Sequence, residues 1–110
     1  MTQFTNKYNL EERTAKFGES IINFCRNLSQ DNISSPLINQ VVRSSTSVGA
    51  NYKDFENKIF ICKKESQETK HWLRMLANCF PDRKEEIRKL WTEAQELTMI
   101  FQKITSSLNK

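Results

Sequence analysis

Apolar side chains recur every three or four residues along most of the chain, and this spacing restricts the possible fold more than any other feature. Such a repeat is typical of amphipathic α-helices, whereas a half-buried strand alternates apolar and polar residues. The chain also has only two glycines and two prolines in 110 residues, fewer turn residues than a β-rich fold of this length needs. The sequence therefore predicts a single all-α domain.

Four helical segments follow from this repeat. We expect helices over residues 10–28, 36–53, 57–80 and 83–108. Because their connections are short, they predict an antiparallel up-and-down four-helix bundle over residues 9–110. Residues 1–8 precede the first repeat and are expected to form a loose N-terminal arm.

Polar residues indicate where three of the helices begin. Capping boxes are predicted for the first and fourth helices, at Asn9 with Glu12 and at Asp82 with Glu85. The second helix has another start signal, a cap residue followed by proline, at Ser35–Pro36.

Few residues are suited to catalysis or metal binding. Glu68 and His71 have the Glu-x-x-His spacing of di-iron bundles, but such a site needs two of these motifs and His71 is the only histidine. Neighbouring Lys70 and Arg74 would also oppose a cation. No nucleophile has a partner base, and no phosphate-binding glycine loop is present. We therefore expect no enzyme activity, no metal site and no cofactor.

The cysteines and the hydropathy indicate a cytoplasmic protein. Cys25, Cys62 and Cys79 are odd in number, match no zinc spacing and adjoin apolar residues, which predicts buried free thiols. No stretch approaches the roughly 20 apolar residues that span a bilayer. The first residues also lack the apolar core of a signal peptide, so no membrane contact is expected.

Basic residues exceed acidic residues by 17 to 13, and clustered cations form a candidate nucleic-acid surface. The residues predicted to contact phosphates are Lys63, Lys64, Lys70, Arg74, Arg83, Lys84, Arg88 and Lys89. Acids lie three or four residues from many of them, so these cations can equally form ordinary surface pairs. If they bind RNA or DNA, they would contact the backbone without reading bases.

Large apolar side chains extend the apolar surface of the third predicted helix beyond a single stripe. Phe60, Trp72 and Met75 lie outside its main stripe, and such excess surface commonly marks an oligomer interface. Exposed Phe60, Trp72 or Trp91 could instead stack on bases, although core or subunit contacts are favoured for each.

Arg43 is the only charged residue between Gln40 and Tyr52. Glu65 and Glu68 lie on adjacent turns of the next predicted helix. An ion pair between them and Arg43 is favoured over contact with a ligand, and it would fix the register of two helices more than it would add stability.

The segments around Arg43 and Glu65 resemble a known bacterial family. The segments that carry the resemblance are Gln40–Tyr52, Asp54–Phe55, Lys58–Ile59, Lys64–Thr69 and Trp72–Leu73. They are similar to the four-helix-bundle proteins encoded in intervening sequences of 23S ribosomal RNA genes. Relatives of that family include the accessory variability protein of diversity-generating retroelements.

The resemblance implies a ring-like homopentamer. It also implies RNA or DNA as a partner, together with a reverse transcriptase-like protein, because the retroelement relatives bind both through a basic surface. The family has no known catalytic residues. The positions that match its motif, interpreted as fold-defining, are Arg43, Ser47, Asn51, Glu65, Glu68 and Trp72.

The chain departs from the family between the second and third helices. Family members usually have several more residues here, whereas Lys53 alone separates Tyr52 from Asp54. Asp54 or Asn57 can cap the third helix. If the connection cannot close into a hairpin, the two segments would form one long helix that exchanges between subunits.

Two functions remain open from the sequence. The first is a non-enzymatic oligomeric bundle that binds nucleic acid through its basic clusters. The alternative is a protein-interaction or scaffold module whose cations only solvate its surface.

Overall fold

A computed structural model shows four long helices and one short 3-10 helix within residues 9–108, the part of the chain that the structure describes. They are α2 (Leu10–Arg26), α3 (Ser34–Tyr52), α4 (Phe55–Cys79), η1 (Pro81–Arg83) and α5 (Lys84–Leu108). No strand occurs in this range, which confirms the all-α prediction. The arm predicted for residues 1–8 lies outside the described residues.

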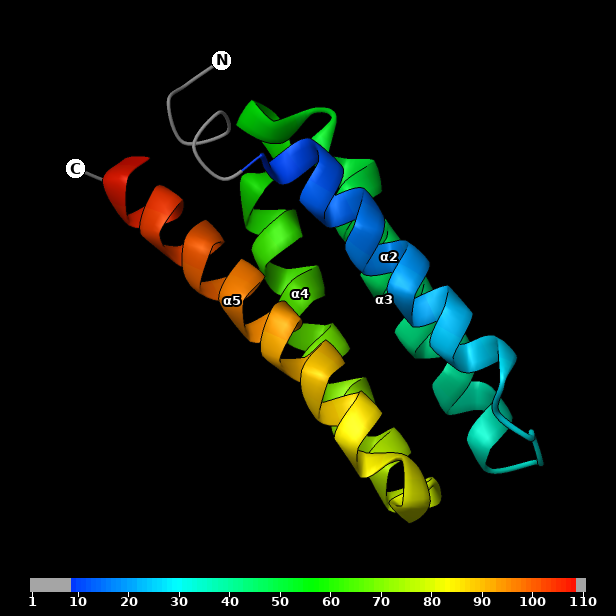
Figure 1. The fold of residues 1–110 in the computed structure, drawn as a ribbon. Coiled ribbons are helices and arrows are strands. Elements are labelled where there is room, and N and C mark those ends of the chain that lie inside the picture. The colour runs from blue at the N-terminus through cyan, green and yellow to red at the C-terminus, as the bar shows by residue number, and fades with distance from the viewer. Residues whose placement is uncertain (1–8, 109–110) are drawn as a thin grey trace.

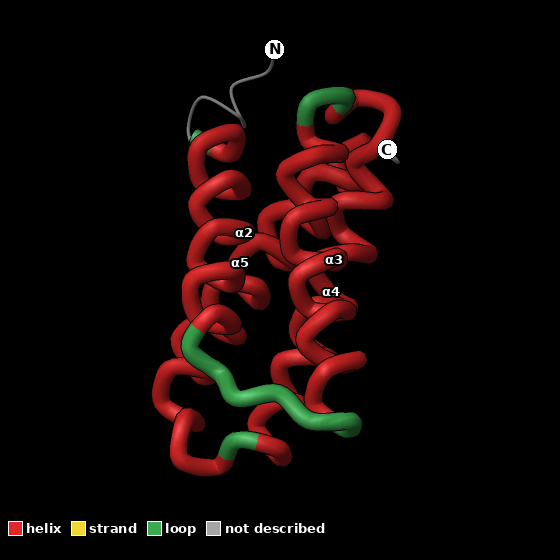
Figure 2. The backbone as a smooth tube through the Cα atoms, turned by 90° about the vertical axis from the view of Figure 1, so that its right-hand side faces the viewer, coloured by secondary structure: helices red, strands yellow, loops and turns green. Residues whose placement is uncertain are grey.

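Successive helices run antiparallel and form an up-and-down bundle (Figures 1 and 2). The closest packing joins α3 to α4, α4 to α5 and α2 to α3, whereas α2 and α5 touch only sparsely. The bundle is therefore tightly closed on three sides and open along the fourth. None of the helices within residues 9–108 is long and apolar enough to cross a membrane.

Each helix contributes one apolar stripe to the core. The fully buried side chains include Leu10, Ile21, Val41, Val48, Ile59, Leu73, Leu76, Leu97 and Phe101. Burial of a side chain of this size stabilises a fold by about 1.5–3 kcal/mol. Two buried hydroxyl pairs cross the same core: Ser44 with Thr69 (2.8 Å) and Ser66 with Thr98 (2.9 Å).

Small residues let α2 and α3 pack closely. A Cβ atom on Gly18 would lie 3.4 Å from the Cα atom of Thr46, and one on Gly49 would lie 3.5 Å from the carbonyl carbon of Thr14. Gly18 and Gly49 therefore mark where α2 and α3 cross closely.

The starts of α2 and α5 differ from the predicted capping boxes. Asn9 precedes α2 in the left-handed conformation (φ 49°, ψ 51°), and its side chain makes no capping hydrogen bond. Asp82 lies inside η1, so α5 starts from a 3-10 turn rather than from an Asp82 cap. Both predicted capping boxes were wrong, because the chain enters each helix in another conformation.

The start of α3 is capped four residues before the predicted Ser35. The carboxylate of Asp31 accepts hydrogen bonds from the backbone N–H groups of Ile33 (2.9 Å) and Ser34 (2.8 Å). In return, the hydroxyl of Ser34 accepts a hydrogen bond from the N–H of Asp31 (3.0 Å). The bonds from Ser34 and Ile33 lower the pKa of Asp31 below its ordinary value.

The short connection between α3 and α4 closes as a hairpin (Figure 2). Only Lys53 and Asp54 separate the two helices, so α4 begins two residues before the predicted residue 57. The side chain of Asn57 donates to the carboxylate of Asp54 (2.8 Å), and a kink follows at Lys58 (φ −124°, ψ 17°). This kink turns the first turn of α4 relative to the rest, which lets so short a connection reverse the chain.

Candidate nucleic-acid interface

The outer junction of α4 and α5 gathers most of the predicted phosphate-contacting cations. Lys63, Lys70 and Arg74 follow one stripe of α4, because seven and eleven residues bring a helix back to the same face. Two hydrogen bonds fix this stripe against α5: Lys63 donates to Gln102 (2.9 Å) and Lys70 donates to Gln95. Gln95 and Gln102 share their stripe of α5 with Arg88 and Trp91 by the same spacing.

We call this surface the α4–α5 seam. Its residues are Phe60, Lys63, Gln67, Lys70, Arg74, Arg88, Trp91, Gln95 and Gln102. Lys84 continues the seam one helical turn before Arg88. None of these residues is acidic, and the amide partners of Lys63 and Lys70 are neutral, so the positive charges of both lysines stay uncompensated.

The acids of α4 nearest the seam turn toward α3. Arg43 lies 3.3 Å from the carboxylate of Glu65 and 2.9 Å from that of Glu68. Glu65 also accepts a hydrogen bond from Ser47 (3.3 Å), which in turn accepts one from Asn51 (2.8 Å). The ion pair predicted for Arg43 is confirmed, and five motif residues form one polar network between α3 and α4.

Trp72, the sixth motif residue, lies outside this network. Its ring packs against the core and meets the ring of His71 edge-on at 4.8 Å. Its indole N–H finds no acceptor among the described residues.

Two acids of α5, Glu93 and Glu96, turn toward α2. Arg13 binds both carboxylate oxygens of Glu93 (2.7 and 2.8 Å) and also binds Glu96 (2.7 Å). The hydrogen bonds that Arg13 donates to the Glu93 carboxylate raise the pKa of Arg13 above its ordinary value. No local pattern in the sequence joins the first helix to the last, so this cluster could not be predicted.

Three predicted cations lie away from the seam. Lys64 pairs with Glu68 (3.6 Å), and Lys89 faces a cleft beside α2. Arg83 is structural, since it binds Glu86 (2.6 Å) and donates to the backbone carbonyl of Asn27 (2.9 Å). The eight predicted cations therefore do not form one surface.

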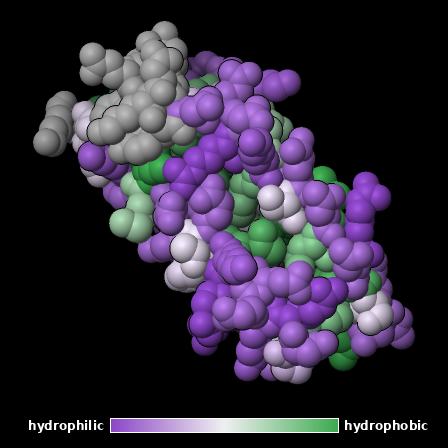
Figure 3. Space-filling model, viewed as in Figure 1, coloured by the Kyte–Doolittle hydropathy of each residue, from purple (hydrophilic) through white to green (hydrophobic). Residues whose placement is uncertain are grey.

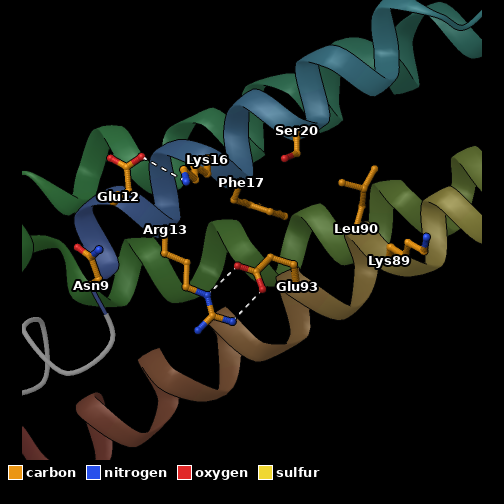
Figure 4. A pocket seen from close by; sticks show the side chains of 9 residues that line it. All are labelled: Asn9, Glu12, Arg13, Lys16, Phe17, Ser20, Lys89, Leu90 and Glu93. Atoms are coloured by element: carbon orange, nitrogen blue, oxygen red, sulfur yellow. Dashed lines mark hydrogen bonds and ion pairs between the residues drawn. The ribbon is translucent and has the colours of Figure 1, made fainter.

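The open side of the bundle holds a cleft between α2 and α5, which Figure 3 shows as apolar atoms flanked by polar side chains. Its volume is about 480 Å³. The lining residues are Asn9, Glu12, Arg13, Lys16, Phe17, Ser20, Lys89, Leu90 and Glu93 (Figure 4). Arg13 and Glu93 bridge it, and its three cations face two acids, so the cleft carries little net charge.

The residues considered for metal or thiol chemistry occupy structural positions. Glu68 binds Arg43, and no three His, Cys, Asp or Glu side chains within residues 9–108 are placed to hold a metal ion. Cys25 and Cys62 are buried as predicted, whereas Cys79 is half-buried. Burial raises the pKa of the Cys25 thiol to about 11 and that of the Cys62 thiol to about 12.

Comparisons with protein-family models, with curated proteins and with solved structures found no match for this chain. The family resemblance of the α3 and α4 segments therefore stays a prediction.

Proposed function

We propose that this protein is a non-enzymatic, oligomeric helical bundle that binds the backbone of RNA or DNA through the α4–α5 seam. The observation that carries the proposal is the separation of charge on α4 and α5. Lys63, Lys70, Arg74 and Arg88 lie on the seam, while four acids of the same two helices are held by arginines of α2 and α3. Of the four cations, Arg88 pairs with an acid of its own helix, the exposed Glu85 (3.3 Å). Clustered cations attract phosphates, and each phosphate contact releases counterions.

The resemblance to the intervening-sequence proteins supports the same class of function and suggests a homopentamer. Exposed apolar side chains within the described residues support self-association: Ile61 is 40% exposed, Met99 59% and Leu108 60%. Sedimentation over a range of concentrations tests this part, and a monomer at every concentration would refute it.

A variant with four seam cations replaced tests nucleic-acid binding. The substitutions are K63Q, K70Q, R74Q and R88Q. Four phosphate contacts on a single strand give log Kd against log salt a slope of magnitude about 3, and the variant should lose most of both slope and affinity. The measurement is the fluorescence anisotropy of a labelled oligonucleotide at several salt concentrations.

A matched control removes the same charge elsewhere. It carries K16Q, K64Q, K89Q and K103Q, all at exposed positions off the seam. We expect it to keep most of the affinity. Equal losses in the two variants would mean that net charge, rather than the seam, attracts the nucleic acid, and would refute the assigned surface.

The alternative function, a protein-interaction module, is favoured by the cleft between α2 and α5. Phe17 and Leu90 line it in a part of the bundle where helix packing is sparse. This function predicts a protein partner whose capture survives nuclease treatment.

A further inference from the structure

Each of the two aromatic rings on the α4–α5 seam lies beside a lysine. The Nζ atom of Lys70 is 5.5 Å from the centre of the Trp91 ring, and that of Lys63 is 5.9 Å from the centre of the Phe60 ring. A cation held near an aromatic face gains a modest cation–π attraction. Together the two groups match the two parts of one nucleotide, since a ring stacks on a base and an ammonium binds a phosphate.

Neither ring is used to build the core of the bundle. Trp91 is 38% exposed and Phe60 is 50% exposed, and neither belongs to the packed core cluster of the described residues. Trp72, by contrast, packs against that cluster. Large aromatic side chains left at the surface within a cationic stripe are the usual composition of a platform for single strands.

The length of the seam fits a short strand. Lys63 and Arg74 are eleven residues apart, which is about 16 Å along a helix. At the spacing of phosphates in a stacked strand, about 3.4 Å, this length covers about five nucleotides.

A duplex cannot use these rings in the same way. Its bases are stacked on one another and show only their edges in the grooves, so a flat ring reaches a base face only by wedging the stack apart. The bases of a single strand have free faces.

We infer that the ligand of the α4–α5 seam is a short single strand of RNA or DNA, with bases stacked on Trp91 and Phe60 and phosphates bound by Lys63, Lys70 and Arg74. This inference rests on the proposed function and specifies its ligand. It makes Trp91 and Phe60 binding residues, a role that charge alone does not give them.

The test compares labelled oligo(dT) of about 12 nucleotides, within the range of site sizes for single domains, with an oligo(dT)·oligo(dA) duplex of equal length. The full chain should bind the single strand more tightly at equal salt. W91L keeps an apolar side chain but removes the aromatic face. It should weaken single-strand binding about fivefold or more while leaving duplex affinity and the salt slope unchanged.

Two further variants make the readout specific. W91F keeps an aromatic face and should restore most of the affinity that W91L loses. F60L should weaken single-strand binding in the same direction as W91L. Circular dichroism melting of each variant shows whether the fold is kept.

The outcomes separate this inference from the proposed function. If the four-cation variant loses binding but W91L and F60L bind like the parent chain, the single-strand inference is overturned and the proposed function stands. If the duplex binds as tightly as the single strand, the single-strand inference is likewise overturned while the proposed function stands. If neither oligonucleotide binds even at low salt, the proposed function fails and this inference fails with it.

Discussion

Arg43 holds two carboxylates of α4 against α3, and its removal should expose how much the fold depends on this cluster. Its guanidinium lies 3.3 Å from Glu65 and 2.9 Å from Glu68. The side chain of Glu65 is only 11% exposed, whereas that of Arg43 is 48% exposed. R43M keeps an apolar stem but removes the positive charge, which leaves a buried carboxylate with the Ser47 hydroxyl as its remaining partner.

The loss of stability expected for R43M lies between the values for a buried and an exposed ion pair. Breaking a fully buried ion pair costs about 3–5 kcal/mol, because the remaining charge has no partner. An exposed pair contributes about 0–1 kcal/mol. Since one partner here is buried and the other is half-exposed, we expect R43M to lower the free energy of unfolding by about 2 kcal/mol.

A double-mutant cycle separates charge from packing. E65Q removes the buried charge while its amide can still accept from Ser47, so R43M/E65Q should recover more than half of the loss. Urea unfolding followed by circular dichroism at neutral pH measures all four proteins. R74M, at an exposed position of the same helical bundle, is the control and should stay within about 0.5 kcal/mol of the parent.

The stabilities of these variants decide whether the Arg43 cluster stabilises the fold. If R43M stays within about 0.5 kcal/mol of the parent, or the double variant is no more stable than R43M, the cluster does not stabilise the fold. Its polar side chains would then favour the ligand-contact interpretation.

Two other features of the described residues give separate predictions. G49A should raise the free energy of unfolding by up to about 1 kcal/mol, because its methyl group would lie 3.5 Å from Thr14, an ordinary contact; a lower melting temperature would show that α2 and α3 pack too closely for it. In the native protein, iodoacetamide should label Cys79 before Cys25 and Cys62, whose thiols have pKa values raised by burial to about 11 and about 12. The free energy of unfolding should also fall as pH rises above about 8.5, because the unfolded thiols ionise there and the folded ones do not. Equal labelling of the three cysteines by mass spectrometry would contradict the first expectation, and a stability that does not change at alkaline pH would contradict the second.

The helices and their buried faces could be predicted because the helical repeat is a local property of the sequence. Their exact starts could not. Asp31 and Ser35 are both good cap residues, and the choice depends on which side chain reaches the free N–H groups. The loop before α3 brings Asp31 and Ser34 together, so the cap forms before Ser35.

The ion pairs between helices show the same limit of prediction from the sequence. Arg43 could be matched to Glu65 because their helices are adjacent in the chain. Arg13 and Glu93 are separated by 80 residues, and nothing in the sequence fixes the register of α2 against α5. The clusters of cations were also divided, because adjacent residues on a helix point about 100° apart; Lys63 joins the seam while Lys64 does not.

These structural ion pairs also set the charge of the proposed binding surface. Arg13 and Arg43 each draw two acids of α4 or α5 away from the seam, toward α2 and α3. The chain as a whole has a modest net charge of +4, which is too general to select a surface. The positive stripe exists because folding holds these four acids on the sides that face α2 and α3 and leaves Lys63 and Lys70 with neutral glutamine partners. The contacts that close the bundle are therefore the same contacts that make one of its faces suited to phosphate.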